Sequence, residues 1–553
     1  MRRGHRFLTF LAALLLGLAH PAAAKDDLTI GLTQFPSTFN PLIDAMMAKS
    51  YILAMTRRAI TTYDKDWKLV CLLCTELPTI ENGLAVPEDL PDGKKGIAIT
   101  IKLNPKATWG DGVPVSADDV VFTWEVGRHP KSGVGSTEGF RRILKIDVKD
   151  PKTVVLHVDR VTFDYNSMSG FDLLPAHLER AKFADPVEYK HRTTFDSDTT
   201  NKGLYSGPYR IGEVVSGSHV TLVPNETWYG PKPYFKRIVV RVIENTAALE
   251  ANLRSGGIDY IAGELGLSLD QALALEKRQR DKFDFVYKAG LVYEHVDLNL
   301  DNPILKDVRV RQALLYGLDR AAISKQLFEG KQPVAESFVS PLDWVVAKDI
   351  PTYRYDPKKA AALLDAAGWS KMAGGFRTNA AGERLSLELM TTAGNRSREL
   401  VEQVLQSQWR ALGMDIRIRN EPARVFFGQT MTQRKFPAMA MYAWISSPEN
   451  VPRTTLHSKE IPTADNNWSG QNYPAFRNAE MDALIDKVEV ELDREKRRAL
   501  WHRIQEIYAE QLPVLPLYFR ADPFIIPKWL KGVEPTGHQF PSTLWVENWK
   551  AVN

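Results

Sequence analysis

The sequence predicts an α/β protein built from two domains of different texture. In the first half, stretches such as residues 96–103 ("GIAITIKL") and 236–243 ("KRIVVRVI") alternate in polarity as strands do, with few helices between them. In the second half, residues 385–420 read as a strand, a helix and another strand. We therefore expect a mixed sheet of the α+β kind first and a partly parallel sheet afterwards. A cleft between two such domains is a common place for a ligand.

The first 24 residues are expected to form a secretory signal peptide rather than part of the fold. Arg2, Arg3 and Arg6 precede an apolar run, and small residues end the segment at Ala24. The apolar run holds about a dozen residues, fewer than the roughly 20 that a membrane-spanning helix needs. We expect cleavage near Ala24, which leaves a soluble protein in a bacterial periplasm.

The composition is that of an ordinary globular protein, with 44% hydrophobic residues. The formal net charge of +4 falls to about +1 when the three arginines of the leader are removed. A chain this neutral has no electrostatic reason to bind nucleic acid or an acidic membrane surface. The length suggests two to four folding units, and no fixed-period repeat points to a solenoid or a propeller.

Two helices carry clear boundary signals. The first begins after Ser116, which can form a capping box with Asp119, so the acidic residues crowded there have a structural role rather than a catalytic one. The second has Asp356 as its cap, Pro357 in its first turn and Gly368 at its far end. These signals mark helix ends and say nothing of function.

The two cysteines stand close together as Cys71 and Cys74 in "CLLC". In an oxidising compartment we expect them to form a small structural disulfide, with two buried thiols as the alternative. A redox pair would need a helix N-terminus or cationic neighbours, and a zinc site would need a second ligand pair.

Catalytic and cofactor motifs do not stand out in the chain, so we expect no enzyme, no cofactor and no metal site. The patterns G-x-S-x-G, H-E-x-x-H and S-x-x-K are absent. The glycine-rich residues 133–139 follow no strand and lack the lysine of a phosphate-binding loop. His295 and His457 are expected to be satisfied polar residues rather than metal ligands, and His457 is kept as a candidate solute contact.

Aromatic side chains in turn-rich polar segments are the best sign of a binding site. Trp444 ends a short apolar strand, Trp468 and Tyr473 lie in "NNWSGQNY", and Phe35 lies in "TQFPSTFNP". Aromatics beside Asn and Gln suit a pocket that packs an organic solute and also forms hydrogen bonds with it. Core aromatics that flank loops are the alternative interpretation.

Five segments, taken in order, share a pattern with one protein family: residues 101–125, 206–233, 301–330, 355–369 and 472–518. They resemble the extracytoplasmic solute-binding proteins of the peptide and nickel ABC importers, family 5, which include dipeptide- and oligopeptide-binding proteins. The resemblance runs from about residue 28 to the C-terminus.

The resemblance implies a two-lobed periplasmic binding protein whose chain crosses the hinge twice, near residues 290 and 515. Lobe I would comprise residues 25–290, with an inserted subdomain, and residues 516–553; lobe II would comprise residues 291–515. The implied partners are a peptide or other small solute, an inner-membrane ABC permease and its ATPase, with the binding protein a monomer. The runner-up solutes are an opine, an oligosaccharide or a metal chelate, and a secreted hydrolase is a remote alternative.

The resemblance also assigns solute contacts. In peptide-binding relatives the loop after the strand that ends in Trp carries an Asp for the peptide's amino group, whereas here Ser447 stands nearest to that place and Glu449 is the candidate substitute. Relatives often hold the solute's carboxylate with an arginine, for which Arg396 and Arg398 are the candidates. The complete set of expected contacts is Phe35, Arg396, Arg398, Trp444, Ser447, Glu449, Asn450, His457, Asn467 and Trp468.

Overall fold

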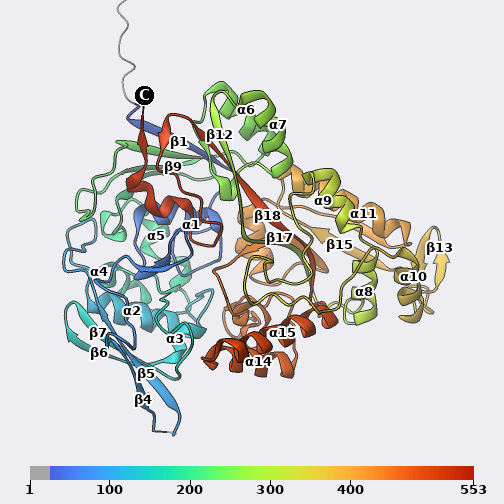
Figure 1. Ribbon diagram of the computed structural model, residues 1–553, viewed down its shortest axis with the longest axis horizontal. Helices are drawn as coiled ribbons and strands as arrows, with labels where there is room; N and C mark the ends of the chain where they lie inside the picture. The colour runs from blue at the N-terminus through green and yellow to red at the C-terminus, as the bar shows by residue number, and fades with distance from the viewer. Residues whose placement is uncertain (1–24, 92, 169, 553) are drawn as a thin grey trace, which may run out of the picture.

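The computed structural model describes residues 25–91, 93–168 and 170–552, so the expected signal peptide lies outside the described residues. One ten-stranded sheet runs through the molecule and takes strands from both halves of the chain (Figure 1). In spatial order its strands are β16 (Asp415–Ile418), β15 (Ser386–Met390), β17 (Met439–Ile445), β12 (Phe283–Leu298), β18 (Val514–Pro527), β11 (Tyr260–Ile261), β1 (Asp27–Leu32), β10 (Arg237–Val242), β9 (His219–Pro224) and β8 (Tyr209–Val215).

Two long antiparallel strands, β12 and β18, join the two halves of this sheet. Nearly all of β18 is buried, which fits the two apolar runs that flank Arg520 and Asp522 in this strand. The register between the two strands shifts before Tyr293 and again before His295, and such irregularities bend a strand. The hinge crossings expected near residues 290 and 515 fall on β12 and β18, and we propose the lobe boundaries stated above on that basis.

The strand, helix and strand predicted in the second half are confirmed. β15 and β16 are parallel neighbours, and α11 (Arg396–Ala411) connects them. The helix buries Val401, Leu405 and Trp409 along one face, as the spacing of its apolar residues requires. Its cap is Asn395, whose side chain accepts a hydrogen bond from the backbone N–H of Arg398.

The strands predicted in the first half are also confirmed, and they divide between two sheets. Residues 236–243 supply β10 of the large sheet, whereas residues 96–103 supply a separate four-stranded sheet. The order in that sheet is β4 (Ala85–Asp89), β5 (Lys95–Lys102), β7 (Thr153–Val158) and β6 (Ile143–Asp150). It lies at the lower left of Figure 1, beside α2 (Ala117–Arg128) and α3 (Glu138–Arg142).

The capping box at the start of α2 is confirmed. The carboxylate of Asp119 accepts hydrogen bonds from the backbone N–H of Ser116 at 2.8 Å and from the indole of Trp109 at 3.1 Å. Its other oxygen accepts the backbone N–H of Ala176 at 2.9 Å. Asp119 is therefore part of the scaffold, as its capping chemistry indicated.

The remaining elements complete the two halves. The other α-helices are α1 (Met47–Thr56), α4 (Ala176–Glu179), α5 (Thr194–Ser197), α6 (Thr246–Ser255), α7 (Leu269–Gln279), α8 (Val308–Tyr316), α9 (Arg320–Phe328), α10 (Pro357–Ala366), α12 (Ala423–Val425), α13 (Arg453–Leu456), α14 (Ala479–Val490) and α15 (Arg494–Gln511). The 3₁₀ and π turns are η1 (Lys182–Ala184), η2 (Tyr189–His191), η3 (Lys202–Leu204), η4 (Gly263–Leu265), η5 (Phe426–Met431), η6 (Ser458–Glu460) and η7 (Ser542–Asn548). Three two-stranded antiparallel sheets pair β2 (Thr61–Tyr63) with β3 (Leu69–Cys71), β13 (Lys371–Ala373) with β14 (Phe376–Thr378), and β19 (Leu530–Lys531) with β20 (Lys550–Ala551).

Each half has its own hydrophobic core. One large cluster gathers residues of the first half with the C-terminal segment, and Trp109 and Trp549 are among its fully buried members. A second cluster surrounds Trp409 in the second half. The structure also joins Cys71 to Cys74 in a disulfide at the end of β3, with their Cα atoms 5.3 Å apart. Among the described residues, no helix combines the length and the apolar character that crossing a membrane demands.

Candidate functional site

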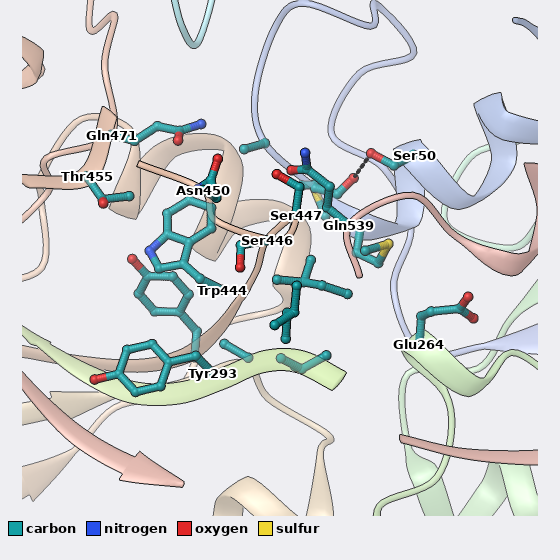
Figure 2. Close-up of a pocket in the computed structure, with 18 of the residues that line it drawn as sticks. Ser50, Glu264, Tyr293, Trp444, Ser446, Ser447, Asn450, Thr455, Gln471 and Gln539 are labelled. Atoms are coloured by element: carbon teal, nitrogen blue, oxygen red, sulfur yellow. Dashed lines mark hydrogen bonds between the residues drawn. The ribbon is translucent and has the colours of Figure 1, made fainter. Parts of the chain in front are cut away.

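A cavity of about 550 Å³ lies between the two halves, with β12 and β18 in its wall. Small-molecule sites commonly have volumes of roughly 300–1,000 Å³. Figure 2 shows side chains that approach the cavity from both halves and from the C-terminal segment. Those labelled in the figure are Ser50, Glu264, Tyr293, Trp444, Ser446, Ser447, Asn450, Thr455, Gln471 and Gln539.

Trp444 lies on the cavity wall at the end of β17. Its ring stacks on that of Tyr473, with centroids 6.0 Å apart, and meets Tyr442 edge-on at 5.5 Å. The hydroxyl of Tyr442 in turn donates to Asp297 at 2.6 Å. Because these contacts hold the half-buried indole, it offers a fixed apolar surface to a solute. Ser447 and Asn450, also expected as contacts, lie on the same wall.

Glu449 is engaged elsewhere, which corrects its expected role as the partner of a solute amine. Its carboxylate forms an ion pair with Arg497 and accepts a hydrogen bond from the indole of Trp344 at 3.0 Å. Its backbone has a φ of 50° and donates to the carboxylate of Asp343 at 2.9 Å. Glu449 is absent from the residues that line the cavity in the described part of the chain.

The two candidate arginines differ in their position relative to the cavity. Arg398 lies on the cavity wall, but its Nε and Nη2 atoms donate to the two carboxylate oxygens of Glu294 at 2.7 and 3.3 Å, and its Nη1 donates to Thr392 at 3.0 Å. Arg396 is exposed and does not line the described cavity. The expectation for Arg396 was therefore wrong, because the first turn of α11 directs only Arg398 inward.

A second arginine, missed by sequence reasoning, completes this buried network. Arg520 of β18 lies 3.8 Å from Glu294 and 3.0 Å from Asp522. Burial by itself would raise the pKa of Glu294, but the two guanidinium groups hold it below its ordinary value. Burial raises the pKa of Asp522 to about 6 against the pull of Arg520. The network comprises two cations and two carboxylates, of which Arg398, Arg520 and Asp522 line the cavity.

Phe35 and His457 do not reach the cavity, so both expectations are corrected. Phe35 is only 5% exposed and packs edge-on against Phe39 in the core of the first half. His457 is buried, accepts the backbone N–H of Lys459 at 3.1 Å and lies 3.6 Å from Asp486. Burial lowers the pKa of His457. Its Nε2 is buried without a hydrogen-bond partner among the described residues, so the expectation of a satisfied polar histidine is met only at Nδ1. Both side chains stabilise the fold beside the site.

Asn467 and Trp468 belong to a loop that joins the two halves outside the cavity, which corrects their expected solute contacts. The amide of Asn467 donates to the carbonyl of Lys131 at 2.9 Å. Ser469 donates to the carbonyl of Val134 at 2.6 Å. We call residues 467–470 the bridging loop. Its polar contacts hold the two halves together around the cavity.

Several cavity residues carried no sequence signal because they come from segments far apart in the chain. Gln471 follows the bridging loop, and Gln539 belongs to the C-terminal segment. That segment approaches β12 closely: the backbone N–H of Leu291 donates to Gly537 at 2.7 Å, and a Cβ on Gly290 would lie 2.3 Å from the Gly537 carbonyl oxygen. Only glycine at position 290 allows this approach.

Comparisons with known proteins agree with this architecture. A family model described as "Bacterial extracellular solute-binding proteins, family 5 Middle" matches residues 79–462. The oligopeptide-binding protein AppA of Bacillus subtilis is 28% identical over 517 residues, which cover 92% of this chain and 88% of that protein.

Two solved structures are also similar. The oligopeptide-binding protein of Thermus thermophilus, complexed with a pentapeptide, has a TM-score of 0.88 at 28% identity and covers 95% of this chain and 96% of its own. The structure of AppA from Bacillus subtilis in complex with a nonapeptide has a TM-score of 0.84 at 24% identity and covers 96% of this chain and 99% of its own. The second likeness shows a shared fold.

Proposed function

Because this chain belongs to the bacterial extracellular solute-binding proteins of family 5, we propose that it captures short peptides or peptide-like solutes for an ABC importer. The cavity between the two halves carries the proposal. Uncharged hydrogen-bonding groups such as Ser447, Asn450 and Gln539 surround it, and Trp444 supplies an aromatic face. A solute there contacts both halves at once, so binding favours the arrangement in which they are together.

Delivery follows from the same geometry. In the proposed cycle the mature protein, cleaved near Ala24, binds its solute in the periplasm as a monomer. The bridging loop and the contacts around it hold the two halves over the solute. The closed complex then docks on an inner-membrane permease, whose ATPase drives release. The protein itself carries out no covalent step.

A non-peptide solute is the second candidate, and the loop after Trp444 favours it. That loop offers Ser447 to the cavity, and its carboxylate at Glu449 is paired with Arg497. An opine, an oligosaccharide or a metal chelate in the cavity would therefore not contact a free carboxylate of this loop. A secreted hydrolase stays a remote alternative, which a turnover screen with ester, amide and glycoside substrates would test.

Calorimetric titration of the mature protein, unfolded and refolded to remove any copurified solute, tests the proposal. The titrants are a pool of dipeptides and tripeptides and, separately, opines and oligosaccharides. Saturable binding of the peptide pool is the expected result. Binding of an opine or an oligosaccharide without binding of any peptide would overturn the peptide assignment and leave the transport role in place.

A further inference from the structure

Some charged side chains on the cavity wall have a partner within the protein, and others lack a partner of opposite charge among the described residues. Arg398 is paired with Glu294, and Arg520 lies beside Asp522. Lys49 donates to the backbone carbonyls of the segment that precedes α1. These cations are therefore already neutralised or hydrogen-bonded within the protein. The wall also carries carboxylates that lack a cationic partner within the described ranges of the chain.

Asp343 is such a carboxylate. It stands on the cavity wall, is only 9% exposed and belongs to the connection between α9 and α10. One of its oxygens accepts the backbone N–H of Glu449 at 2.9 Å, and the other accepts the backbone N–H of Val345 at 3.4 Å. Within the described part of the chain, no Lys, Arg or His lies within ion-pair distance of it.

The two backbone donors leave part of this carboxylate unused. An ionised carboxylate offers about four lone-pair positions, and these two hydrogen bonds occupy only part of them. Burial without a cation raises the pKa of Asp343, as expected when the charged form loses its hydration. A buried charge of this kind is stabilised when a cation with N–H donors binds beside it.

The position of Asp343 places it beside the loop that lines the cavity after Trp444. The hydrogen bond from Glu449 fixes the carboxylate against residues 446–450, from which Ser447 and Asn450 line the same wall.

Asp172 and Glu264 also line the wall without a basic group within ion-pair distance in the described part of the chain. Asp172 is a weaker candidate because it interacts electrostatically with Lys49 and Arg57. Glu264 is also a weaker candidate. One of its oxygens accepts the backbone N–H of Ser542 at 2.8 Å, and burial raises its pKa to about 7, so it is largely neutral below that pH.

We infer that Asp343 receives a cationic group of the solute, which for a peptide is the free α-amino group. This inference rests on the proposed function and deepens it, because it selects solutes that carry an ammonium group over neutral or N-blocked ones. The ammonium would donate to the unused positions of the carboxylate, and the neighbouring uncharged side chains would accept its remaining hydrogens. Asp343 thus determines solute specificity from a segment remote in sequence from Trp444.

The test is calorimetric titration of the refolded mature protein with a tripeptide pool and with the same pool N-acetylated. Wild-type protein is compared with D343N and with the control D349N. Asp349 is an exposed residue on the same connection and lies outside the cavity lining, so its replacement removes an equal charge without touching the site. Circular dichroism and the melting temperature establish that each variant folds.

We expect wild type and D349N to bind the free-amine pool at least 10-fold more tightly than the acetylated pool, and D343N to lose this preference. Equal affinity of wild type for both pools, or an unchanged preference in D343N, would overturn the inference. Equal affinity of wild type for both pools would overturn the inference even if D343N fails to fold. Binding of neither pool by wild type would instead remove the proposed peptide function, and this inference with it.

Discussion

The guanidinium of Arg398 and the carboxylate of Glu294 form a two-point ion pair in the cavity wall, with N–O distances of 2.7 and 3.3 Å. Both side chains are buried, and Arg520 approaches the same carboxylate to 3.8 Å. The pair joins the first turn of α11 to the hinge strand β12. Arg398 therefore maintains the shape and charge balance of the site.

Replacement of Arg398 by Gln should lower the free energy of unfolding by about 3 kcal/mol, because a buried Glu294 is left without its main partner. The control is Arg396→Gln, two residues earlier and exposed, which should change that free energy by less than about 0.5 kcal/mol. Urea unfolding of both variants measures the difference. Equal effects would show that the ion pair does not stabilise the fold.

Replacement of Trp444 by Ala should weaken solute binding by roughly 10-fold or more, since the solute loses an aromatic wall held by Tyr442 and Tyr473. Trp228→Ala is the matched control, because Trp228 packs on Tyr229 in the first half and does not line the described cavity. Titration with the best-bound solute gives both affinities. A loss of the same size in the control would contradict the role of Trp444.

Replacement of Ser469 by Ala should weaken binding about fivefold without removing any solute contact. Its hydroxyl bonds the carbonyl of Val134 across the two halves at 2.6 Å, and a net loss of about 1 kcal/mol is typical of one hydrogen bond. Ser458→Ala is the control, since Ser458 bonds Asp482 within the second half. Stopped-flow dissociation should be faster for the Ser469 variant alone; equal rates in both variants would argue against a closing role for the bridging loop.

Glu402 should make stability fall as pH rises. Its carboxyl is 2% exposed, and burial raises its pKa from 4.5 to about 7. Between these values the folded protein keeps a proton that the unfolded chain releases, so the free energy of unfolding decreases with pH, in total by about 3 kcal/mol. Denaturation from pH 4.5 to 7.5 should show a steeper slope in wild type than in Glu402→Gln, in which buried acids such as Glu264 and Asp522 still contribute. Parallel curves for the two proteins would contradict the prediction.

Local patterns were the most predictable part of this protein. The capping box of Ser116 and Asp119, the start of the helix at Pro357 and the strand, helix and strand around α11 all depend on neighbours within a few residues. For the same reason Trp444 was found, since an aromatic residue near the end of a strand, before a polar loop, lies where the strand opens to its surroundings.

The errors at the site share one physical cause. Arg396 and Arg398 stand in the same helical turn, yet only the second points into the network with Glu294. Glu449 has the charge expected of a solute contact, but Arg497, 48 residues later, takes its carboxylate. Sequence pattern identifies the type of side chain that a site needs, whereas the partner that occupies each side chain comes from a distant segment.

The sequence by itself determined the α/β class, the elements of both halves and, through its resemblance, the two-lobed family. Those features follow from short-range propensity and from the order of whole segments. Only the tertiary structure decided which charged side chains pair with one another within the protein. It also decided that Asp343 lies beside the loop after Trp444 without a basic partner in the described part of the chain. Electrostatic pairing depends on separations in space of a few ångströms, and the long strands β12 and β18 set those separations between residues hundreds of positions apart.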